Sequence, residues 1–284
     1  SVEVGDFHYP APPSLVVFKT EAEGSFFGAI VNIGALFGAL MGGPLSEQFG
    51  RKKSVLVQAP IYALSWAALA LLSSFGPLML ARTLLGVGVG LTTSTVPAYI
   101  SEVAPTRLRG AFGAFFQMAV TAGIMFSSLL GAYVFVEELD GHKFCQWRNL
   151  SWSVLVLAVA LFVCTLAVPE SPRWLASKGR MEEARTSLVR LRGGAEFVAE
   201  ELQEITDSAS SSQSSSSSGL RDLWTHRRAI GIGLMLMLIQ QFSGVNAIIF
   251  FQDTIFQDAG MADAASLGFY VMLLQVVVTG VSIP

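Results

Sequence analysis

Three amide side chains interrupt an apolar run near the end of the sequence. Gln240, Gln241 and Asn246 lie within residues 229–251, which are otherwise almost entirely apolar. Polar groups inside a membrane-length run usually mark a binding site or a pathway, because lipid cannot satisfy their hydrogen bonds. Amides are uncharged, and they both donate and accept hydrogen bonds. The three residues therefore predict a site for a neutral, hydroxyl-rich ligand.

A fourth amide, Gln117, lies in another apolar run, and Thr121 follows it by one helical turn. Residues four apart share one helix face, so we expect both side chains to face the same interior space. Gln241 and Asn246 would point about 140° apart on a straight helix with 3.6 residues per turn. Gly244, between them, offers a place where the helix can break and let the two amides converge. The open alternative is that the amides only join helices to one another.

Three connections between apolar runs each carry a carboxylate and an arginine. The carboxylates are Glu47, Glu102 and Glu170, and the arginines Arg51, Arg109 and Arg173 can pair with them across neighbouring helix ends. Bidentate pairs between neighbouring helix ends are strong and geometrically specific, so breaking them is a candidate switch. We call these six residues the latch and expect them to hold helix ends together at one membrane face. The open alternative is that the basic residues only anchor and orient the helices.

The elements that must position these residues follow from the composition. Hydrophobic residues make up 52% of the 284 residues, charged residues make up 14%, and the mean hydropathy is +0.56. A chain this apolar is predicted to be an integral membrane protein. Runs of roughly 20 apolar residues, the length that crosses a bilayer as a helix, occur at 25–45, 55–73, 78–100, 111–136, 150–168, 229–251 and 264–283.

The first of these runs carries Gly34, Gly38 and Gly42 at four-residue spacing. That spacing leaves one helix face without side chains, so another helix can approach it closely. The contact could be static, or it could be an interface at which the helices slide.

The distribution of basic residues predicts the orientation of the chain. Lys and Arg concentrate in the connections after the first, third and fifth apolar runs, which are therefore cytoplasmic by the positive-inside rule. Within the longest connection, residues 180–191 and 197–206 have helical spacing, and 208–218 reads as a flexible serine-rich linker. The predicted regions are an extracellular segment (1–24), a transmembrane bundle (25–168), a cytoplasmic helical insert with its linker (169–228), and the start of a second bundle (229–284).

Five segments, in order along the chain, resemble the signature motifs of the sugar porter family of the major facilitator superfamily. They are residues 43–52, 97–105, 107–110, 169–175 and the amide heptad 240–246. The resemblance implies an all-α, polytopic membrane protein of the major facilitator type, in which two six-helix bundles rock about a sugar site at the midplane. About seven of the twelve family helices would be present, helices 2–6 in 25–168 and helices 7–8 in 229–284.

The same resemblance assigns roles to residues. Gln117 matches the family's sugar-binding glutamine, and Gln240, Gln241 and Asn246 match the amides of its seventh helix. Arg82 lies about one turn inside the extracellular end of its run, where a lone cation needs a partner. In proton-coupled relatives the matching arginine faces an aspartate on the family's first helix, whereas facilitative relatives have a neutral residue there. Arg82 is therefore a candidate coupling residue.

We expect a hexose or disaccharide transporter that works by alternating access, either facilitative or proton-coupled. Its membrane would be the plasma membrane or, alternatively, an endosomal or vacuolar membrane. Its partners would be the sugar, the lipid bilayer and, if transport is coupled, protons. No enzymatic activity, cofactor or metal site is expected. The net charge of −3 says little about nucleic acid, but the sequence has no basic stripe interleaved with aromatic residues, so no nucleic-acid partner is expected.

Alternating access needs two bundles, so the chain alone is not expected to be transport-competent. Two alternatives stay open. One is a seven-helix receptor, because about seven spans with an outside N-terminus fit that topology too. The other is a non-transporting partner isoform.

Overall fold

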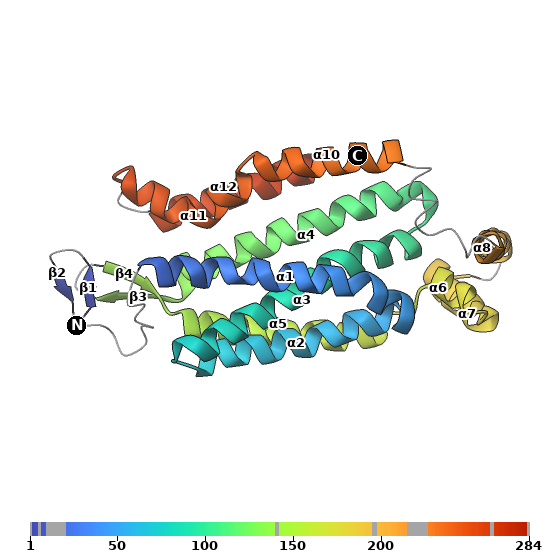
Figure 1. Ribbon diagram of the computed structural model, residues 1–284, viewed down its shortest axis with the longest axis horizontal. Coiled ribbons are helices and arrows are strands. Elements are labelled where there is room, and N and C mark those ends of the chain that lie inside the picture. The colour runs from blue at the N-terminus through green and yellow to red at the C-terminus, as the bar shows by residue number, and fades with distance from the viewer. Residues whose placement is uncertain are drawn as a thin grey trace.

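The chain folds as a bundle of long helices, with short helices at one end and two small hairpins at the other (Figure 1). The computed structural model describes residues 2–4, 7–9, 21–139, 142–194, 198–214, 227–261 and 264–282. The first five long helices are α1 (Glu21–Phe49), α2 (Arg51–Leu71), α3 (Phe75–Val103), α4 (Arg109–Leu129) and α5 (Trp147–Ala167). The remaining three are α10 (Arg227–Phe242), α11 (Val245–Asp258) and α12 (Ala264–Val281).

Shorter elements lie between and beyond these helices. One 3₁₀ turn, η1 (Thr106–Leu108), precedes α4, and a π-helical turn, η2 (Leu130–Val134), follows it. The short helices at one end are α6 (Pro172–Ser177), α7 (Met181–Arg192) and α8 (Val198–Ser214). The hairpins are antiparallel pairs, β1 (Val2–Val4) with β2 (Phe7–Tyr9), and β3 (Val136–Leu139) with β4 (His142–Cys145).

The predicted all-α, polytopic membrane fold is confirmed. Within the described residues, helices long and apolar enough to span a bilayer cover Ala22–Phe49, Arg51–Leu71, Phe75–Val103, Thr106–Val134, Trp147–Ala167 and Arg227–Ile249. The predicted run 264–283 contains a shorter apolar helix, Ser266–Val281. Large apolar side chains cover the outside of the bundle, as expected where lipid rather than water is the solvent.

Helices α1 and α3 pack together through glycines. A Cβ atom added at Gly34 would lie 2.1 Å from the backbone oxygen of Thr83, and one at Gly38 would lie 2.2 Å from that of Val87. The approach is reciprocal, because a Cβ at Gly86 would lie 2.1 Å from the backbone oxygen of Val31. Contact this close leaves no room for side chains between the two helices, which confirms the close approach predicted from the glycine spacing.

Helices α2 and α3 are joined by a buried polar ladder. Gln58 is fully buried, and its amide nitrogen donates to Thr95 Oγ1 at 2.6 Å while its Oε1 accepts from Thr92 Oγ1 at 2.9 Å. The hydroxyl of Tyr62 pairs with Thr92 Oγ1 at 2.8 Å. Each polar group thus has a partner inside the bundle, as buried polar groups in a membrane require.

The short helices α6, α7 and α8 form a separate apolar cluster. Trp174 and Leu175 of α6, Leu188 of α7, and Val198 and Ile205 of α8 are buried against one another. Helices α7 and α8 match the two helical stretches predicted in the insert. Helix α8 runs further than predicted, because residues 208–214 of the predicted linker continue it, and residues 215–218 lie outside the described residues.

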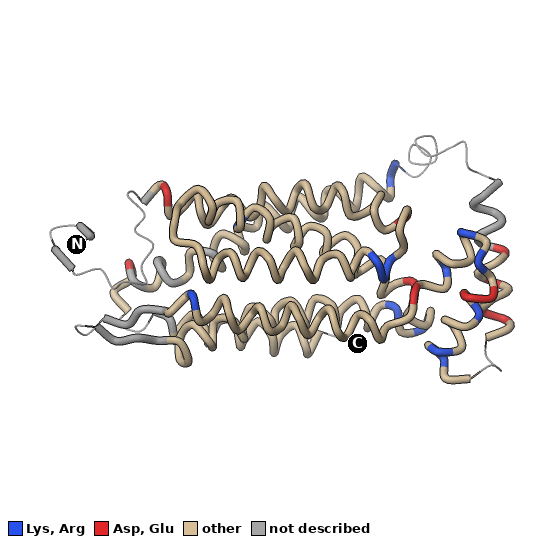
Figure 2. Tube along the Cα trace, turned by 90° about the horizontal axis from the view of Figure 1, so that it is seen from below, with Lys and Arg blue, Asp and Glu red and all other residues tan. Residues whose placement is uncertain are grey.

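Charged residues gather at the ends of the bundle, and most of them lie around α6, α7 and α8 (Figure 2). We call this end, which also carries the junction between α1 and α2, the charged end. The middle lengths of the spans carry almost no charge (Figure 2). A polar site at that depth would therefore be built from uncharged side chains.

Candidate binding site and latch

The amide heptad lies at a break between two helices. Helix α10 ends at Phe242 and α11 begins at Val245, and between them Gly244 has φ +76°. That conformation is left-handed, which glycine adopts without steric cost because it has no Cβ. The predicted break at Gly244 is confirmed. Helix α11 begins directly after the break, and its first turn is closed by the hydrogen bond from Ile248 N–H to the Gly244 carbonyl at 3.1 Å.

The break brings two predicted site residues together. Asn246 Nδ2 donates a hydrogen bond to Gln241 Oε1 at 2.9 Å, although the two side chains would point about 140° apart on a straight helix. Both side chains are exposed, and so is Gln240. This hydrogen bond does not use the side-chain N–H donors of Gln241 or the side-chain carbonyl acceptor of Asn246, so these groups could bind a ligand. Adjacent donors and acceptors of this kind suit neighbouring hydroxyl groups.

Ser243 stabilises the break. Its Oγ donates to the Gln240 carbonyl at 2.6 Å, and its N–H donates to the Ile239 carbonyl at 3.0 Å. The hydroxyl proton is thus occupied by the turn itself. The three amides are therefore the candidate ligand-binding groups of the heptad.

Gln117 lies on α4 with an exposed side chain, whereas Thr121 is buried. The two residues lie one turn apart on the same helix, but only Gln117 is exposed. The Thr121 hydroxyl lies within hydrogen-bonding distance of the Met118 carbonyl at 3.0 Å and the Gln117 carbonyl at 3.3 Å, so its own helix satisfies it. Among the described contacts, no hydrogen bond joins Gln117 to the three amides of the heptad. The side chains of all four amides are exposed.

Arg51 and Glu102 form the ion pair at the centre of the latch. Arg51 Nε lies 3.1 Å from both carboxylate oxygens of Glu102, and Nη2 lies 2.9 Å from Oε1. The side chains are only 15% and 16% exposed, and Arg51 Nη1 also donates to the Ser46 carbonyl at 2.8 Å. This fork fixes the start of α2 to the end of α3.

Glu170 accepts hydrogen bonds from backbone N–H groups and belongs to none of the described ion pairs. Its Oε1 accepts the backbone N–H groups of Arg51, Lys52 and Ser171, each at 2.9 Å. The carboxylate thus caps the first turn of α2, where unpaired N–H groups and the helix dipole favour a negative charge. Gly50 permits this approach, because it has φ +102° and a Cβ there would lie 2.4 Å from Glu170 Oε2.

The other predicted members of the latch are not paired with one another. The described ion pairs are Arg51–Glu102, Arg180–Glu183 and Arg192–Glu201, so neither Arg109 nor Arg173 belongs to one. Arg109 Nε is buried without a hydrogen-bond partner, and Arg173 is exposed. The expected pairing of these two arginines is therefore not found. The two carboxylates that could pair with these arginines have other partners. Glu102 pairs with Arg51, and Glu170 accepts backbone N–H groups at the start of α2.

Glu47 is exposed and meets the short helices through its backbone. Its carbonyl accepts a hydrogen bond from Trp174 Nε1 at 2.9 Å. Nearby, the Tyr99 hydroxyl donates to the Pro169 carbonyl at 2.7 Å. The sequence did not predict either contact, because a hydrogen bond from an aromatic side chain to a backbone carbonyl produces no recognisable pattern of charged residues.

A further pair that the sequence did not single out fixes α8. Arg192 Nε and Nη2 donate to the Glu201 carboxylate at 2.8 and 2.7 Å, and Nη1 donates to the Val103 carbonyl at 2.9 Å. The hydrogen bonds to Arg192 hold the pKa of Glu201 below its usual value, against the opposing effect of burial, and those to Glu201 raise the pKa of Arg192. This pair joins α7, α8 and the end of α3.

Arg82, the candidate coupling residue, lies in α3 with its guanidinium 5.1 Å from the centre of the Phe27 ring. Its Nε is buried without a hydrogen-bond partner. The ring supplies a cation–π contact, which satisfies part of the charge but none of the N–H donors.

Comparisons with known proteins agree on one family. The family model described as "Sugar (and other) transporter" matches residues 14–284. The Arabidopsis thaliana protein "Sugar transporter ERD6-like 6" is 35% identical over 280 residues, which cover 96% of this chain and 55% of that protein. The Bombyx mori "Facilitated trehalose transporter Tret1" is 33% identical over 243 residues, covering 85% of this chain and 46% of that protein.

Solved structures agree with these relatives. The proton:xylose symporter XylE, bound to 6-bromo-6-deoxy-D-glucose, is 28% identical with a TM-score of 0.79, covering 91% of this chain and 58% of that one. The chain thus spans about half the length of the relatives it matches. None of these findings supports the seven-helix receptor alternative.

Proposed function

The chain belongs to the sugar porter family of the major facilitator superfamily, and we propose that it serves the transport of a hexose or disaccharide across a membrane by alternating access. Relatives named as sugar and trehalose transporters support the substrate class. The uncharged lining of the spans agrees with a neutral ligand. Transport of this kind requires binding and conformational change but no covalent chemistry.

The observation that carries this proposal is the Gln241–Asn246 pair across the break at Gly244. A sugar hydroxyl both donates and accepts, and a hydrogen-bonded amide pair presents both functions side by side. Gln240 would extend that wall, and Gln117 on α4 would contribute a facing one. Helix breaks that place polar groups at the midplane are the usual way in which transporters build such sites.

We further propose that the charged end is cytoplasmic and that its contacts hold the helix ends together in one state of the cycle. Separating α2 from α3 would break the Arg51–Glu102 fork, and separating α2 from α6 would remove the Glu170 cap. Both contacts join segments that are far apart in the sequence, so they are suited to act as a switch. Residues 1–24 would then be extracellular and 169–228 cytoplasmic, with the plasma membrane as the proposed location.

Coupling to protons would require a carboxylate partner for Arg82, whereas facilitative transport would not. The Phe27 contact already gives Arg82 a partial partner without any acid, and we therefore propose facilitative transport. Sugar binding that releases or takes up protons, measured by calorimetry in two buffers of different ionisation enthalpy, would contradict this.

The test of the site is sugar binding by the purified chain carrying Gln241→Ala. Losing one or two hydrogen bonds of about 1 kcal/mol each should weaken the affinity about 5- to 30-fold. Gln203→Ala, at an exposed position on α8, is the matched control and should leave the affinity unchanged. Unaltered affinity in the Gln241 variant, with membrane insertion intact, would refute the proposed site.

Uptake of radiolabelled hexose into vesicles tests a separate part of the proposal. Because alternating access needs two complete bundles, we propose that the 284-residue chain binds sugar without transporting it. Saturable uptake by the chain alone would contradict this, while leaving the binding site intact.

A further inference from the structure

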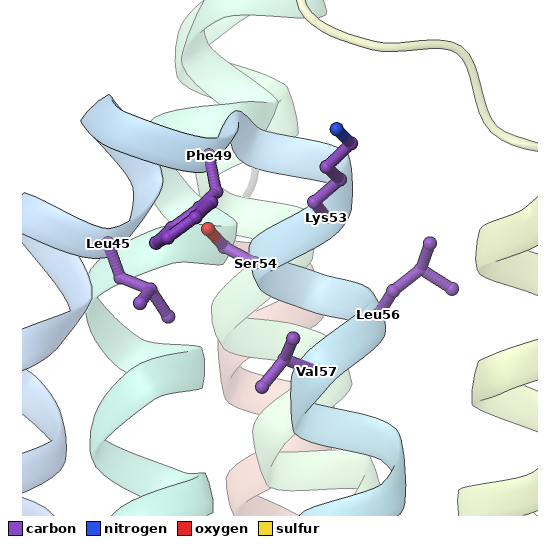
Figure 3. Close-up of a pocket in the computed structure, with 6 residues that line it drawn as sticks. All are labelled: Leu45, Phe49, Lys53, Ser54, Leu56 and Val57. Carbon is purple, nitrogen blue, oxygen red and sulfur yellow. The ribbon is translucent and has the colours of Figure 1, made fainter.

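An apolar pocket of about 360 Å³ lies where α1 meets α2 at the charged end (Figure 3). Its lining residues are Leu45 and Phe49 from the end of α1, and Lys53, Ser54, Leu56 and Val57 from the start of α2. The Ser54 hydroxyl donates to the Gly50 carbonyl at 2.7 Å, so its proton is not available to an occupant. The walls that remain are hydrocarbon.

The pocket opens on the outer surface of the bundle. Phe49 is 49% exposed and Val57 is 48% exposed, and both belong to helices that span the membrane. In Figure 3 the side chains of Leu45, Phe49 and Val57 lie around one space, whereas Lys53 stands above it with its ammonium directed away from Val57. A molecule entering from the bilayer would therefore meet apolar walls first and a cation at the rim.

Lys53 is in none of the described ion pairs, and its two neighbours already have partners. Arg51 is paired with Glu102, and Lys52 Nζ donates to the Leu166 carbonyl at 2.8 Å. None of the ion pairs that the structure describes includes Lys53. Glu47, the nearest acid in sequence, lies two positions from both Leu45 and Phe49 and so on the opposite side of α1. Lys53 is thus the charged residue among those that line the pocket.

We propose that this pocket binds one acyl chain of an anionic phospholipid, with the lipid phosphate against Lys53. Apolar walls next to a single cation at a span end match the two parts of such a lipid, a hydrocarbon tail and a negative headgroup. A zwitterionic lipid would fit the walls equally well but gain less from the cation. The bound lipid would join the ends of α1 and α2 directly beside Gly50.

The test is native mass spectrometry of the purified chain in detergent, titrated with phosphatidylglycerol or phosphatidylcholine of the same acyl chains. The unmodified chain should bind phosphatidylglycerol about fivefold more tightly, the contribution of one Lys or Arg near an anionic surface. Lys53→Gln should abolish that preference and leave phosphatidylcholine binding unchanged. Val57→Trp should fill the pocket and weaken the binding of both lipids.

Arg107→Gln is the matched control, because Arg107 is another exposed basic residue at the charged end, outside the pocket. It should leave the lipid preference unchanged. Equal losses in the Lys53 and Arg107 variants would mean diffuse charge attraction and would overturn the proposal. Unaltered lipid binding in Val57→Trp would also overturn the proposal. A dimer of the chain that Val57→Trp disrupts would overturn it too, since the occupant of the pocket would then be a second copy of the chain. Thermal unfolding of each variant confirms that it is folded.

Discussion

Replacing Glu170 with Gln tests whether a carboxylate far along the chain holds the start of α2. The substitution keeps the shape of the side chain and one carbonyl oxygen, but it removes the charge. In the native protein Glu170 Oε1 accepts three backbone N–H groups, from Arg51, Lys52 and Ser171. The first two are helix-end donors of α2, for which Gly50 offers no side-chain cap.

The expected loss follows from these three hydrogen bonds. A bond to a charged group contributes about 1.5–3 kcal/mol and a neutral one about 0.5–1.5 kcal/mol, and charge at a helix N-terminus adds about 0.3–1 kcal/mol. The three donors share one oxygen, so their losses do not add fully. We therefore expect the free energy of local opening at the start of α2 to fall by about 2 kcal/mol.

Hydrogen–deuterium exchange with mass spectrometry measures this opening directly. A loss of about 2 kcal/mol corresponds to about 30-fold faster exchange of the Arg51 and Lys52 amides. The matched control is Glu183→Gln, which breaks the exposed pair with Arg180 (side chains 47% and 57% exposed). That pair should contribute little, so exchange at the start of α2 should stay unchanged.

Two outcomes would refute the reasoning. If the Arg51 and Lys52 amides exchange in Glu170→Gln at the native rate, the charge of the carboxylate does not stabilise the helix end. If Glu183→Gln accelerates the same amides equally, the effect comes from general loosening of the charged end and not from the cap.

Two further predictions concern the helix contacts. Gly38→Ala places a Cβ 2.2 Å from the Val87 backbone oxygen and should lower the melting temperature strongly. Gly28→Ala is the control, because a Cβ there has nothing within 4 Å, and it should leave the melting temperature nearly unchanged. Equal melting temperatures of the two variants would exclude close packing at Gly38. The lowered pKa of Glu201 means that its pair with Arg192 stabilises the fold above the unfolded pKa, near 4.5, and loses that contribution as the pH falls through the folded value. The melting-temperature difference between the native chain and Glu201→Gln should therefore be present at pH 6 and shrink below about pH 4.5, and a difference independent of pH would contradict this.

Features that depend on short stretches of chain were predictable from the sequence. Composition alone identified a membrane protein, because a span must be apolar whatever it packs against. The break at Gly244 could also be expected, since one glycine between Gln241 and Asn246 decides the local backbone. The spacing of Gly34 and Gly38 indicated a close helix contact but did not identify α3 as the partner.

The pairing at the charged end was decided only by the tertiary structure. The sequence identified the right kinds of residue, but their partners depend on where separate helix ends meet. Arg51 pairs with Glu102, and Glu170 caps a helix that begins 119 residues earlier. Such contacts form between residues far apart in sequence, so no local pattern encodes them. The side-chain types were set by the sequence, and the geometry that makes them a fork and a cap exists only once α2, α3 and α6 have packed.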